Sequence, residues 1–267
     1  MKQVLHEMKT DIKMKNVMWT HSNMCNYRCS YCTPNHYAGD IRGPKDYSKM
    51  INFLVKWQGN DLLCLDITGG EPTLWPKFQD FCKDYTEAAT GPVGITFTSN
   101  GARTLRYWKE FDAPIDTIGF SFHPEFASED HYLNVLEAVQ YKGSRIDVYL
   151  LAYPKYFDKI QKFYHRLKDS NLKINVQPKI VYDWVNGGGP LESYTDEMLE
   201  FCKSQFRKSP YKTITNHRLL LDGKEISVRE LKADRLNQWK GWKCKGGHDY
   251  LSIKPDGLVY GAECRVF

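Results

Sequence analysis

Short apolar runs alternate along the chain with segments whose apolar residues recur at helical spacing. Short apolar runs bounded by turn residues predict buried strands, and stripes at i, i+3 and i+4 predict amphipathic helices. The predicted strands are 17–20, 62–68, 94–98, 116–122, 147–152 and 173–177. The predicted helices are 46–58, 76–89, 104–111, 128–141 and 156–167. This alternation predicts an α/β fold with a parallel sheet, either an open doubly wound sheet or a partial barrel, with its site at the carboxyl ends of the strands.

The pattern changes after the glycine-rich stretch 187–190, which is the best candidate for a domain boundary because glycine and proline break regular structure. Beyond it, 195–207 has the pattern of one more helix. Two hairpin turns follow, one at Asp222-Gly223 and one at Pro255-Asp256-Gly257. We therefore expect a barrel domain over 15–186 and a small α+β extension over 191–267.

Composition and charge narrow the class of protein. Of the 267 residues 42% are hydrophobic, which indicates a folded chain. A mean hydropathy of −0.56 and the lack of a long apolar run exclude a transmembrane helix, and no signal-peptide core precedes the first strand, so we expect a cytoplasmic protein without a membrane partner. The net charge of +5 would help to hold an anionic substrate or an acidic protein, but no basic run or zinc-finger spacing indicates nucleic-acid binding.

Three of the eight cysteines, Cys25, Cys29 and Cys32, are spaced C-x3-C-x2-C. In a cytoplasmic protein they need a role other than structural disulfides. Three thiolates on one loop can hold three irons of a [4Fe–4S] cluster and leave the fourth iron free, whereas four cysteines would close the cluster. Zinc sites usually combine two cysteine pairs, and no second pair follows here. The spacing therefore favours an iron–sulfur cluster over zinc and over buried or redox thiols.

The motif C-x3-C-x-aromatic-C, with Tyr31 at the aromatic position, resembles the signature of the radical S-adenosylmethionine (radical SAM) enzymes. The resemblance implies that the free iron chelates the amino and carboxylate groups of the SAM methionine. An electron from a donor such as flavodoxin or ferredoxin then splits SAM. The resulting 5′-deoxyadenosyl radical abstracts a hydrogen atom from the substrate. Tyr31 would pack near the adenine, and the protein would be oxygen-sensitive.

Further motifs of the same resemblance follow the next strands. Gly-Gly-Glu at 69–71 matches the family motif that hydrogen-bonds the methionine amino group, and glycine lets a backbone approach closely. Thr98-Ser99-Asn100-Gly101 alone would be an ordinary turn, but such a sequence lines the family's SAM site. The residues expected to bind SAM are Tyr31, Gly69, Gly70, Glu71, Ser99, Asn100, Ser121 and Gln177. The resemblance spans 17–178 and implies a partial (β/α)6 TIM-like barrel that is open on one side.

Asp66, His123 and Glu125 are the candidates for facing the substrate. The run 65–74 is similar to that of the molybdenum-cofactor GTP cyclase, which has an arginine where this chain has Asp66. A carboxylate facing a triphosphate would be unfavourable. The interpretations left open are a peptide or protein side chain, a small molecule or nucleotide, and, in another class, a non-catalytic Fe–S or zinc binding module. The turns at 69–72 and 98–101 argue against a bare binding module.

Cys244 and Cys264 flank the second hairpin, and their surroundings resemble the start of a twitch/SPASM-like extension. In that extension such cysteines begin an auxiliary Fe–S cluster. Two thiolates do not normally hold a [4Fe–4S] cluster, so either the extension is truncated or a further residue such as Cys202 or His248 is a ligand. The alternative is a cysteine pair on a structural extension.

Overall fold

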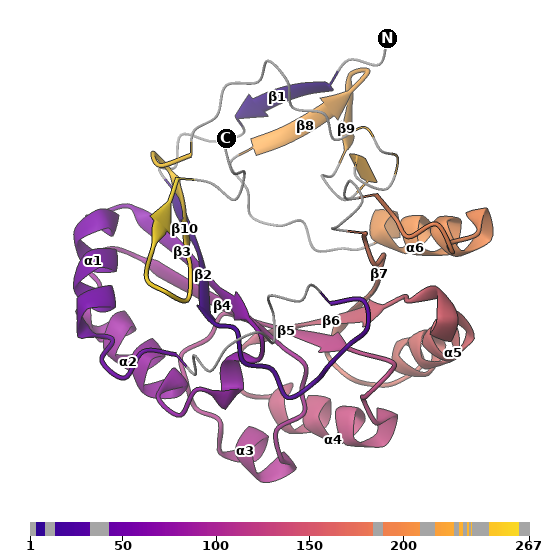
Figure 1. The fold of residues 1–267 in the computed structure, drawn as a ribbon, viewed down its shortest axis with the longest axis horizontal. Helices are drawn as coiled ribbons and strands as arrows, with labels where there is room; N and C mark the ends of the chain where they lie inside the picture. The colour runs from indigo at the N-terminus through magenta and orange to yellow at the C-terminus, as the bar shows by residue number, and fades with distance from the viewer. Residues whose placement is uncertain are drawn as a thin grey trace.

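The computed structural model describes residues 4–8, 14–32, 43–183, 189–208, 217–226, 230–231, 234, 236 and 246–261. Within these residues the main sheet contains a run of parallel strands in the order β2-β3-β4-β5-β6-β7. Sequence order and spatial order coincide, so the winding never reverses and the doubly wound alternative is excluded. Figure 1 shows the strands forming an arc. The strands are β2 (Met14–Ser22), β3 (Leu62–Gly69), β4 (Val93–Ser99), β5 (Thr117–Phe122), β6 (Arg145–Leu151) and β7 (Asn175–Lys179).

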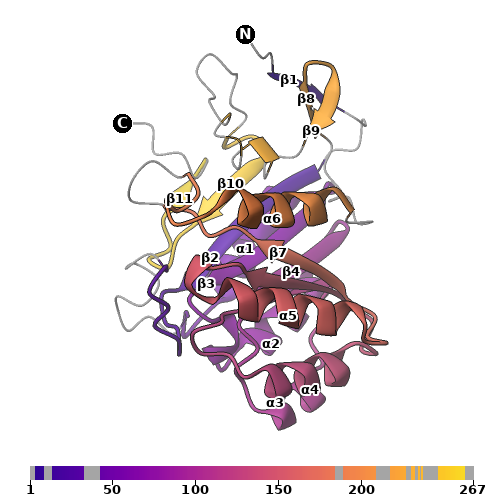
Figure 2. The ribbon, with the colours of Figure 1, turned by 90° about the vertical axis from the view of Figure 1, so that its right-hand side faces the viewer.

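A helix follows each of these strands, and the helices cover the outer face of the arc (Figures 1 and 2). The predicted strand–helix alternation is confirmed, with ends that shift by a few residues. The helices are α1 (Ser48–Gln58), α2 (Phe78–Ala88), α3 (Leu105–Glu110), α4 (Glu129–Val139), α5 (Phe157–Lys168) and α6 (Asp196–Lys208), with short 3-10 helices η2 (Pro72–Leu74) and η3 (Pro154–Tyr156). None of the helices in the described ranges has the length and apolarity that crossing a membrane requires.

The two faces of each strand meet different surroundings because successive side chains point to opposite sides. On β3, Leu63, Leu65 and Ile67 are fully buried beneath the helices. Asp66 and Thr68, at the alternate positions, lie on the inner, concave face and are more accessible. The outer layer is rich in aromatic rings, for example Phe97, Phe120 and Trp108. The core therefore lies between sheet and helices, and the concave face is left polar.

The strands beyond the predicted boundary belong to two different sheets. β10 (Tyr250–Ile253) pairs in parallel with β2, and β11 (Val259–Tyr260) completes the predicted second hairpin at the edge of the sheet. β1 (Val4–Met8) pairs with β8 (His217–Leu221), which forms the first predicted hairpin with β9 (Lys224–Ile226). A hairpin turn can be recognised from the local sequence. The further strand that the hairpin pairs with, β1 for β8 and β2 for β10, depends on contacts between distant parts of the chain. The boundary between 186 and 191 stays a prediction.

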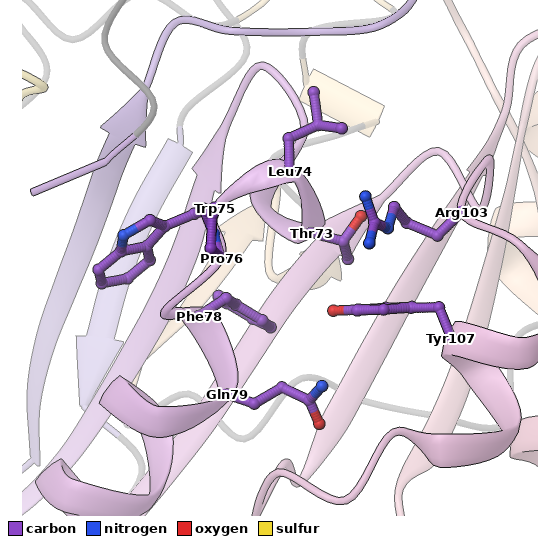
Figure 3. A pocket seen from close by; sticks show the side chains of 8 residues that line it. All are labelled: Thr73, Leu74, Trp75, Pro76, Phe78, Gln79, Arg103 and Tyr107. Atoms are coloured by element: carbon purple, nitrogen blue, oxygen red, sulfur yellow. The ribbon is translucent and has the colours of Figure 1, made fainter. Parts of the chain in front are cut away.

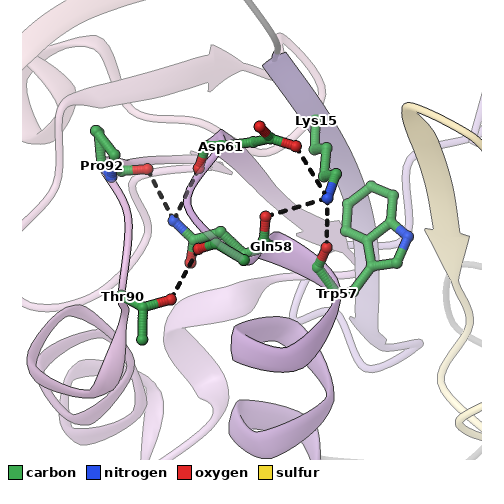
Figure 4. A network of polar contacts seen from close by, with 7 residues as sticks. Lys15, Trp57, Gln58, Asp61, Thr90 and Pro92 are labelled. Atoms are coloured by element: carbon green, nitrogen blue, oxygen red, sulfur yellow. Dashed lines mark hydrogen bonds and ion pairs between the residues drawn. The ribbon is translucent and has the colours of Figure 1, made fainter.

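Lys15 secures the amino-terminal end of the barrel (Figure 4). Its ammonium donates to the carbonyls of Trp57 at 2.6 Å and Gln58 at 3.1 Å, and pairs with Asp61 at 3.1 Å. The two carbonyls belong to the last turn of α1, where helical carbonyls lack backbone partners. A cation there also complements the helix dipole. Lys15 thus ties β2 to the end of α1.

We expect Lys15→Met to lower the free energy of unfolding by about 1–2 kcal/mol, because two partly buried carbonyls lose a charged donor. Urea denaturation followed by circular dichroism measures the change. Lys83→Met is the matched control, since the Lys83–Asp112 pair is solvent-exposed, and its effect should be much smaller. Equal effects of the two substitutions would contradict this role of Lys15.

Candidate functional site

The three closely spaced cysteines lie on the loop after β2, at the carboxyl end of the sheet. Cys29 is buried, and Cys25 and Cys32 are half-buried. The N–H of Cys32 donates to the carbonyl of Cys29 at 3.0 Å, and the N–H of Tyr27 donates to Cys25 Sγ at 3.4 Å. Burial raises the pKa of Cys25, and raises that of Cys29 to about 12. Both thiols therefore keep their protons at neutral pH until a metal displaces them.

The metal centres considered above place different demands on the thiols. Among the described residues, no three His, Cys, Asp or Glu side chains converge on a point that one metal ion would occupy. A structural zinc ion requires ligands at about 2.0–2.3 Å in a tetrahedron. In an iron–sulfur cluster the thiolates bind different irons and stay apart. The preference for a cluster therefore rests on the C-x3-C-x2-C spacing of the three cysteines on one loop.

The turn after β3 packs directly against the start of the cysteine loop. The N–H of Gly70 donates to the carbonyl of Ser22 at 3.0 Å, and the N–H of Glu71 donates to that of Met24 at 2.7 Å. A Cβ on Gly69 would lie 2.3 Å from the Ser22 oxygen, and a Cβ on Gly70 would lie 2.0 Å from the Met24 oxygen. Glycine is therefore required at both positions, and the space beside it is taken by the backbone of the cysteine loop.

The carboxylate of Glu71 is enclosed and joins the turn after β3 to the end of β4. Oε1 accepts hydrogen bonds from the N–H and hydroxyl of Thr73, at 3.1 and 2.7 Å, and from the hydroxyl of Ser99 at 2.8 Å. Oε2 accepts from the N–H of Asn100 at 2.6 Å. Burial raises the pKa of Glu71, and these hydrogen bonds oppose the rise. Both oxygens are thus occupied by donors of the protein itself.

Asn100 extends from the end of β4 to the cysteine loop. Its side-chain Nδ2 donates to Asn26 Oδ1 at 2.8 Å and lies 3.8 Å from Cys25 Sγ. Its Oδ1 accepts from the N–H of Ala102 at 2.9 Å, and Gly101 has a φ of +71°. The expected Asn-Gly turn is present, and the same asparagine contacts the loop that carries the cysteines.

The loop after β5 holds the cysteine loop from the other side. Nδ1 of His123 lies 3.2 Å from Cys29 Sγ and 3.0 Å from the hydroxyl of Tyr31. Glu125 accepts from the N–H of Ser30 at 2.7 Å and from its hydroxyl at 2.5 Å. His123 and Glu125, two of the residues expected to face a substrate, therefore contact the cysteine loop.

Aromatic rings surround this contact. Tyr31 is parallel to His123, with centroids 6.0 Å apart, and lies 4.8 Å from Tyr153, just after β6. Tyr27 stacks on Phe126 at 5.2 Å, and 47% of Phe126 is exposed. The cysteine loop is thus in contact with the ends of the strands from β3 to β6.

Three other predicted residues lie on the concave face. Ser121 neighbours Tyr149 in the register of the sheet, and Tyr149 neighbours Gln177 on β7. Asp66 lies on β3, three residues before Gly69. Its carboxylate accepts a hydrogen bond from the hydroxyl of Thr96 at 3.0 Å. These residues lie on the inner wall, whereas Gly69, Gly70, Glu71, Ser99 and Asn100 form the contacts with the cysteine loop.

Cys244 and Cys264 lie outside the described residues. Of the further ligands considered for them, Cys202 is fully buried in α6, as its helical spacing predicts, and His248 is exposed. The auxiliary cluster and the twitch/SPASM-like extension stay predictions.

Sequence reasoning missed several residues near the cysteine loop. His21 is buried, with Nδ1 3.0 Å from the carbonyl of Thr68, and its Nε2 has no partner among the described residues. Burial lowers its pKa to about 4. A register irregularity between Thr20 and Ser22 accompanies this placement. An irregularity of this kind leaves no mark in the hydrophobic pattern. Asn26, which accepts from Asn100, was also missed, although its place between two of the cysteines is a signal that could have found it.

A small pocket of about 130 Å³ lies on the outer side of Glu71, between η2 and α3. Figure 3 shows Arg103 above the ring of Tyr107, facing Thr73 across the pocket. The guanidinium carbon lies 4.7 Å from the ring centroid. The pocket is lined by Thr73, Leu74, Trp75, Pro76, Phe78, Gln79, Arg103 and Tyr107, so none of the predicted site residues lines it.

Comparison with known proteins finds relatives that are enzymes acting on nucleotides, by their names. The chain is 29% identical over 98 residues to an S-adenosylmethionine-dependent nucleotide dehydratase of Thermoplasmatales archaeon (strain ISO4-H5), covering 36% of this chain and 33% of that protein. It is 27% identical over 131 residues to a GTP 3′,8-cyclase of Edwardsiella ictaluri (strain 93-146), covering 44% of this chain and 39% of that protein. The alignments thus span between 33% and 39% of the length of these relatives.

Solved structures with the same fold extend the likeness along the chain. Native anSMEcpe with bound AdoMet (SAM) superposes with a TM-score of 0.60 at 15% identity, covering 95% of this chain and 75% of that one. Streptococcus suis SuiB bound to S-adenosylmethionine gives a TM-score of 0.60 at 13% identity, covering 93% of this chain and 60% of that one. These confirm the expected fold. The model of the radical SAM superfamily matches residues 19–153, and with this match over half of its length the chain belongs to the radical SAM superfamily, whose enzymes use a [4Fe–4S] cluster and S-adenosylmethionine.

Proposed function

We propose that Cys25, Cys29 and Cys32 hold the [4Fe–4S] cluster and that the protein acts on a small polar molecule bound against the concave face. The observation that supports this proposal most is the seating of the cysteine loop on the ends of several barrel strands, next to a polar inner wall. In parallel α/β barrels the carboxyl ends of the strands carry the active site.

The cluster and SAM would supply the radical chemistry that removes a hydrogen atom from the substrate. The residues of the chain would bind the cluster, place it and exclude water. The three thiols lose their protons to bind iron. The loop holds them on one side of the barrel opening, with Cys29 in the protein interior. A barrel wall on one side and the loop on the other would keep water away from the reacting atoms.

We assign SAM to the surface formed by Tyr31, Gly69, Gly70, Ser99, Asn100 and Ser121, with Gln177 on the far wall. Glu71 has a different role from the one the family motif implies. Its two oxygens already accept four hydrogen bonds from Thr73, Ser99 and Asn100. We therefore propose that its side chain positions the Gly-Gly turn, and that SAM meets the backbone of that turn.

His123 and Glu125 hold the cysteine loop through Cys29, Tyr31 and Ser30. We propose that they position the loop and that Asp66 is the member of the predicted set that faces the substrate. The relatives named above act on nucleotides, and the polar inner wall suits a small polar substrate. A flavodoxin or ferredoxin is the proposed electron donor.

The central test is reconstitution with iron and sulfide without oxygen, reduction, addition of SAM and assay of 5′-deoxyadenosine. We expect about four irons per chain and 5′-deoxyadenosine from the natural sequence. Cys29→Ala should lose both, since one thiolate ligand is gone. Cys64→Ala, which removes a thiol of β3 outside the loop, should keep its iron. Stoichiometric zinc in a colourless protein, or equal iron in both variants, would refute the assignment.

Glu71→Gln separates a positioning role from direct contact with SAM. An amide nitrogen cannot accept, so one buried donor would face another, and we expect the free energy of unfolding of the metal-free protein to fall by about 2 kcal/mol. Urea denaturation measures this fall, with the exposed Glu110→Gln as control. If stability is unchanged while SAM cleavage is lost, Glu71 acts on SAM itself.

Gly70→Ala tests the contact between the two loops. The new Cβ would meet the Met24 oxygen at 2.0 Å, so the cysteine loop must move and iron per chain should fall to a small fraction of the natural level. Gly94→Ala is the control on β4, because the nearest atom to its Cβ lies at 3.9 Å. Normal iron content in Gly70→Ala would show that the loop is not held there.

A further inference from the structure

Arg103 brings a positive charge to the small pocket on the outer side of Glu71. It lies between β4 and α3, and the pocket has a volume of about 130 Å³. The described residues that line the pocket include no Asp or Glu. Within the part of the chain that the structure describes, Nε of Arg103 is buried and has no hydrogen-bond partner. A buried N–H without an acceptor is unfavourable, so this guanidinium fits a site that an external acceptor completes.

The guanidinium is held at the pocket by contacts of its side chain and its backbone. Its carbon lies 4.7 Å from the centroid of the Tyr107 ring, over which Figure 3 shows it. Nε2 of His131 lies 3.1 Å from the carbonyl oxygen of Arg103 and 3.2 Å from that of Gly101. Stacking on an aromatic face leaves the N–H groups at the edge of a guanidinium able to donate. The charge is therefore positioned without being neutralised.

Glu71 adjoins the pocket through Thr73 but is not the partner of Arg103. Thr73 lines the pocket, and its N–H and hydroxyl donate to Glu71 Oε1 at 3.1 and 2.7 Å. The other hydrogen bonds that the structure gives this carboxylate come from Ser99 and Asn100. Glu71 is thus engaged by these three residues rather than by the guanidinium.

Two further polar groups of the lining can donate. Oε1 of Gln79 accepts from the N–H of Asp112 at 2.9 Å, so the amide nitrogen of Gln79 is the end left for another partner. Figure 3 shows this amide below the ring of Tyr107, and the hydroxyl of Tyr107 directed toward Thr73. A guanidinium, an amide nitrogen and a phenol hydroxyl are all donors. The lining therefore favours a ligand made of acceptors.

The size of the pocket limits the ligand further. Pockets that hold drug-sized molecules have volumes of about 300–1,000 Å³, and this one has about 130 Å³. The planar fork of an arginine matches the two oxygens of a carboxylate or a phosphate. Both observations point to a single small group that carries several oxygens and a negative charge.

We propose that the pocket is a second binding site of the protein, which takes a small oxyanion, a carboxylate or a phosphate, on Arg103. None of the residues proposed to bind SAM or substrate lines it, so the anion site stands apart from the proposed function. Through Thr73 the pocket borders the turn that contacts the cysteine loop. An anion that binds the folded protein there would stabilise it.

Isothermal titration of the reconstituted protein with inorganic phosphate and with acetate tests the site, with the ionic strength held constant by sodium chloride. We expect saturable binding of at least one of these anions, at one per chain, and no binding of tetramethylammonium. The anion that binds more tightly identifies the ligand as a phosphate or a carboxylate. Absence of saturable binding for both anions overturns the proposal.

The same titrations with SAM present separate this pocket from the SAM surface. The dissociation constant of the anion should be unchanged by SAM, because the two sites share no residue. Competition between SAM and the anion would place the anion on the SAM surface and overturn the proposal.

Variants of two arginines with the same charge assign the binding to the pocket. Arg103→Gln should weaken anion binding at least tenfold, and Arg103→Lys should retain it in part. Arg106→Gln is the matched control, because it removes the same charge from an exposed pair with Glu110, and its binding should equal that of the natural sequence. Equal weakening in Arg103→Gln and Arg106→Gln would show a general effect of charge and no site.

Gln79→Glu gives a test that leaves Arg103 in place. The new carboxylate can still accept from the N–H of Asp112, so we expect the variant to fold with a thermal midpoint no lower than that of the natural sequence. Its negative charge in the pocket should weaken anion binding at least tenfold. Natural affinity in the folded Gln79→Glu protein would exclude this pocket as the site, even if Arg103→Gln failed to fold.

Discussion

The backbone contact between the turn after β3 and the cysteine loop is the constraint on which the site depends. Two N–H groups of the turn bind carbonyls at the start of the loop, and only glycine leaves room for that approach. The enclosed carboxylate of Glu71 fastens the turn to β4, and Asn100 returns from β4 to the loop. The cysteine loop, the turn after β3 and the end of β4 therefore form one packed unit. Such packing makes the unit rigid, and a reactive group needs a rigid support to be placed precisely.

The carboxylates of Glu71 and Asp66 have the same chemistry but different surroundings, and the surroundings give them different roles. Glu71 is buried and accepts four bonds from the protein, three at Oε1 and one at Oε2, so most of its acceptor capacity is used. Asp66 is accessible and receives one bond from Thr96. Burying a carboxylate is tolerable only when donors replace water, which explains why the first belongs to the scaffold and the second is available to a ligand. A sequence motif that contains Glu71 does not by itself reveal which task it has.

Most of the barrel could be predicted because each strand and helix carries its own hydrophobic period. The cysteine spacing and the turns after the strands likewise predict a site region, and the structure brings these segments into contact. Three features could not be predicted. The pairing of β10 with β2 joins segments from opposite ends of the chain. The irregularity beside His21 leaves the hydrophobic pattern unchanged. The contacts of His123 and Glu125 with the cysteine loop depend on side-chain reach across two loops, which periodicity does not encode.

The place of β10 has a consequence for how the chain acquires its structure. β2 precedes the cysteine loop, yet one of its two neighbours in the sheet is supplied by residues 250–253. During synthesis β2 and β3 can pair early, but the other edge of β2 stays open until the chain has been made well beyond the last barrel strand, β7. An open apolar edge invites pairing with other chains, and contacts of long sequence separation form slowly. The strand that leads into the cysteine loop thus gains its second neighbour only after all the other barrel strands have been made.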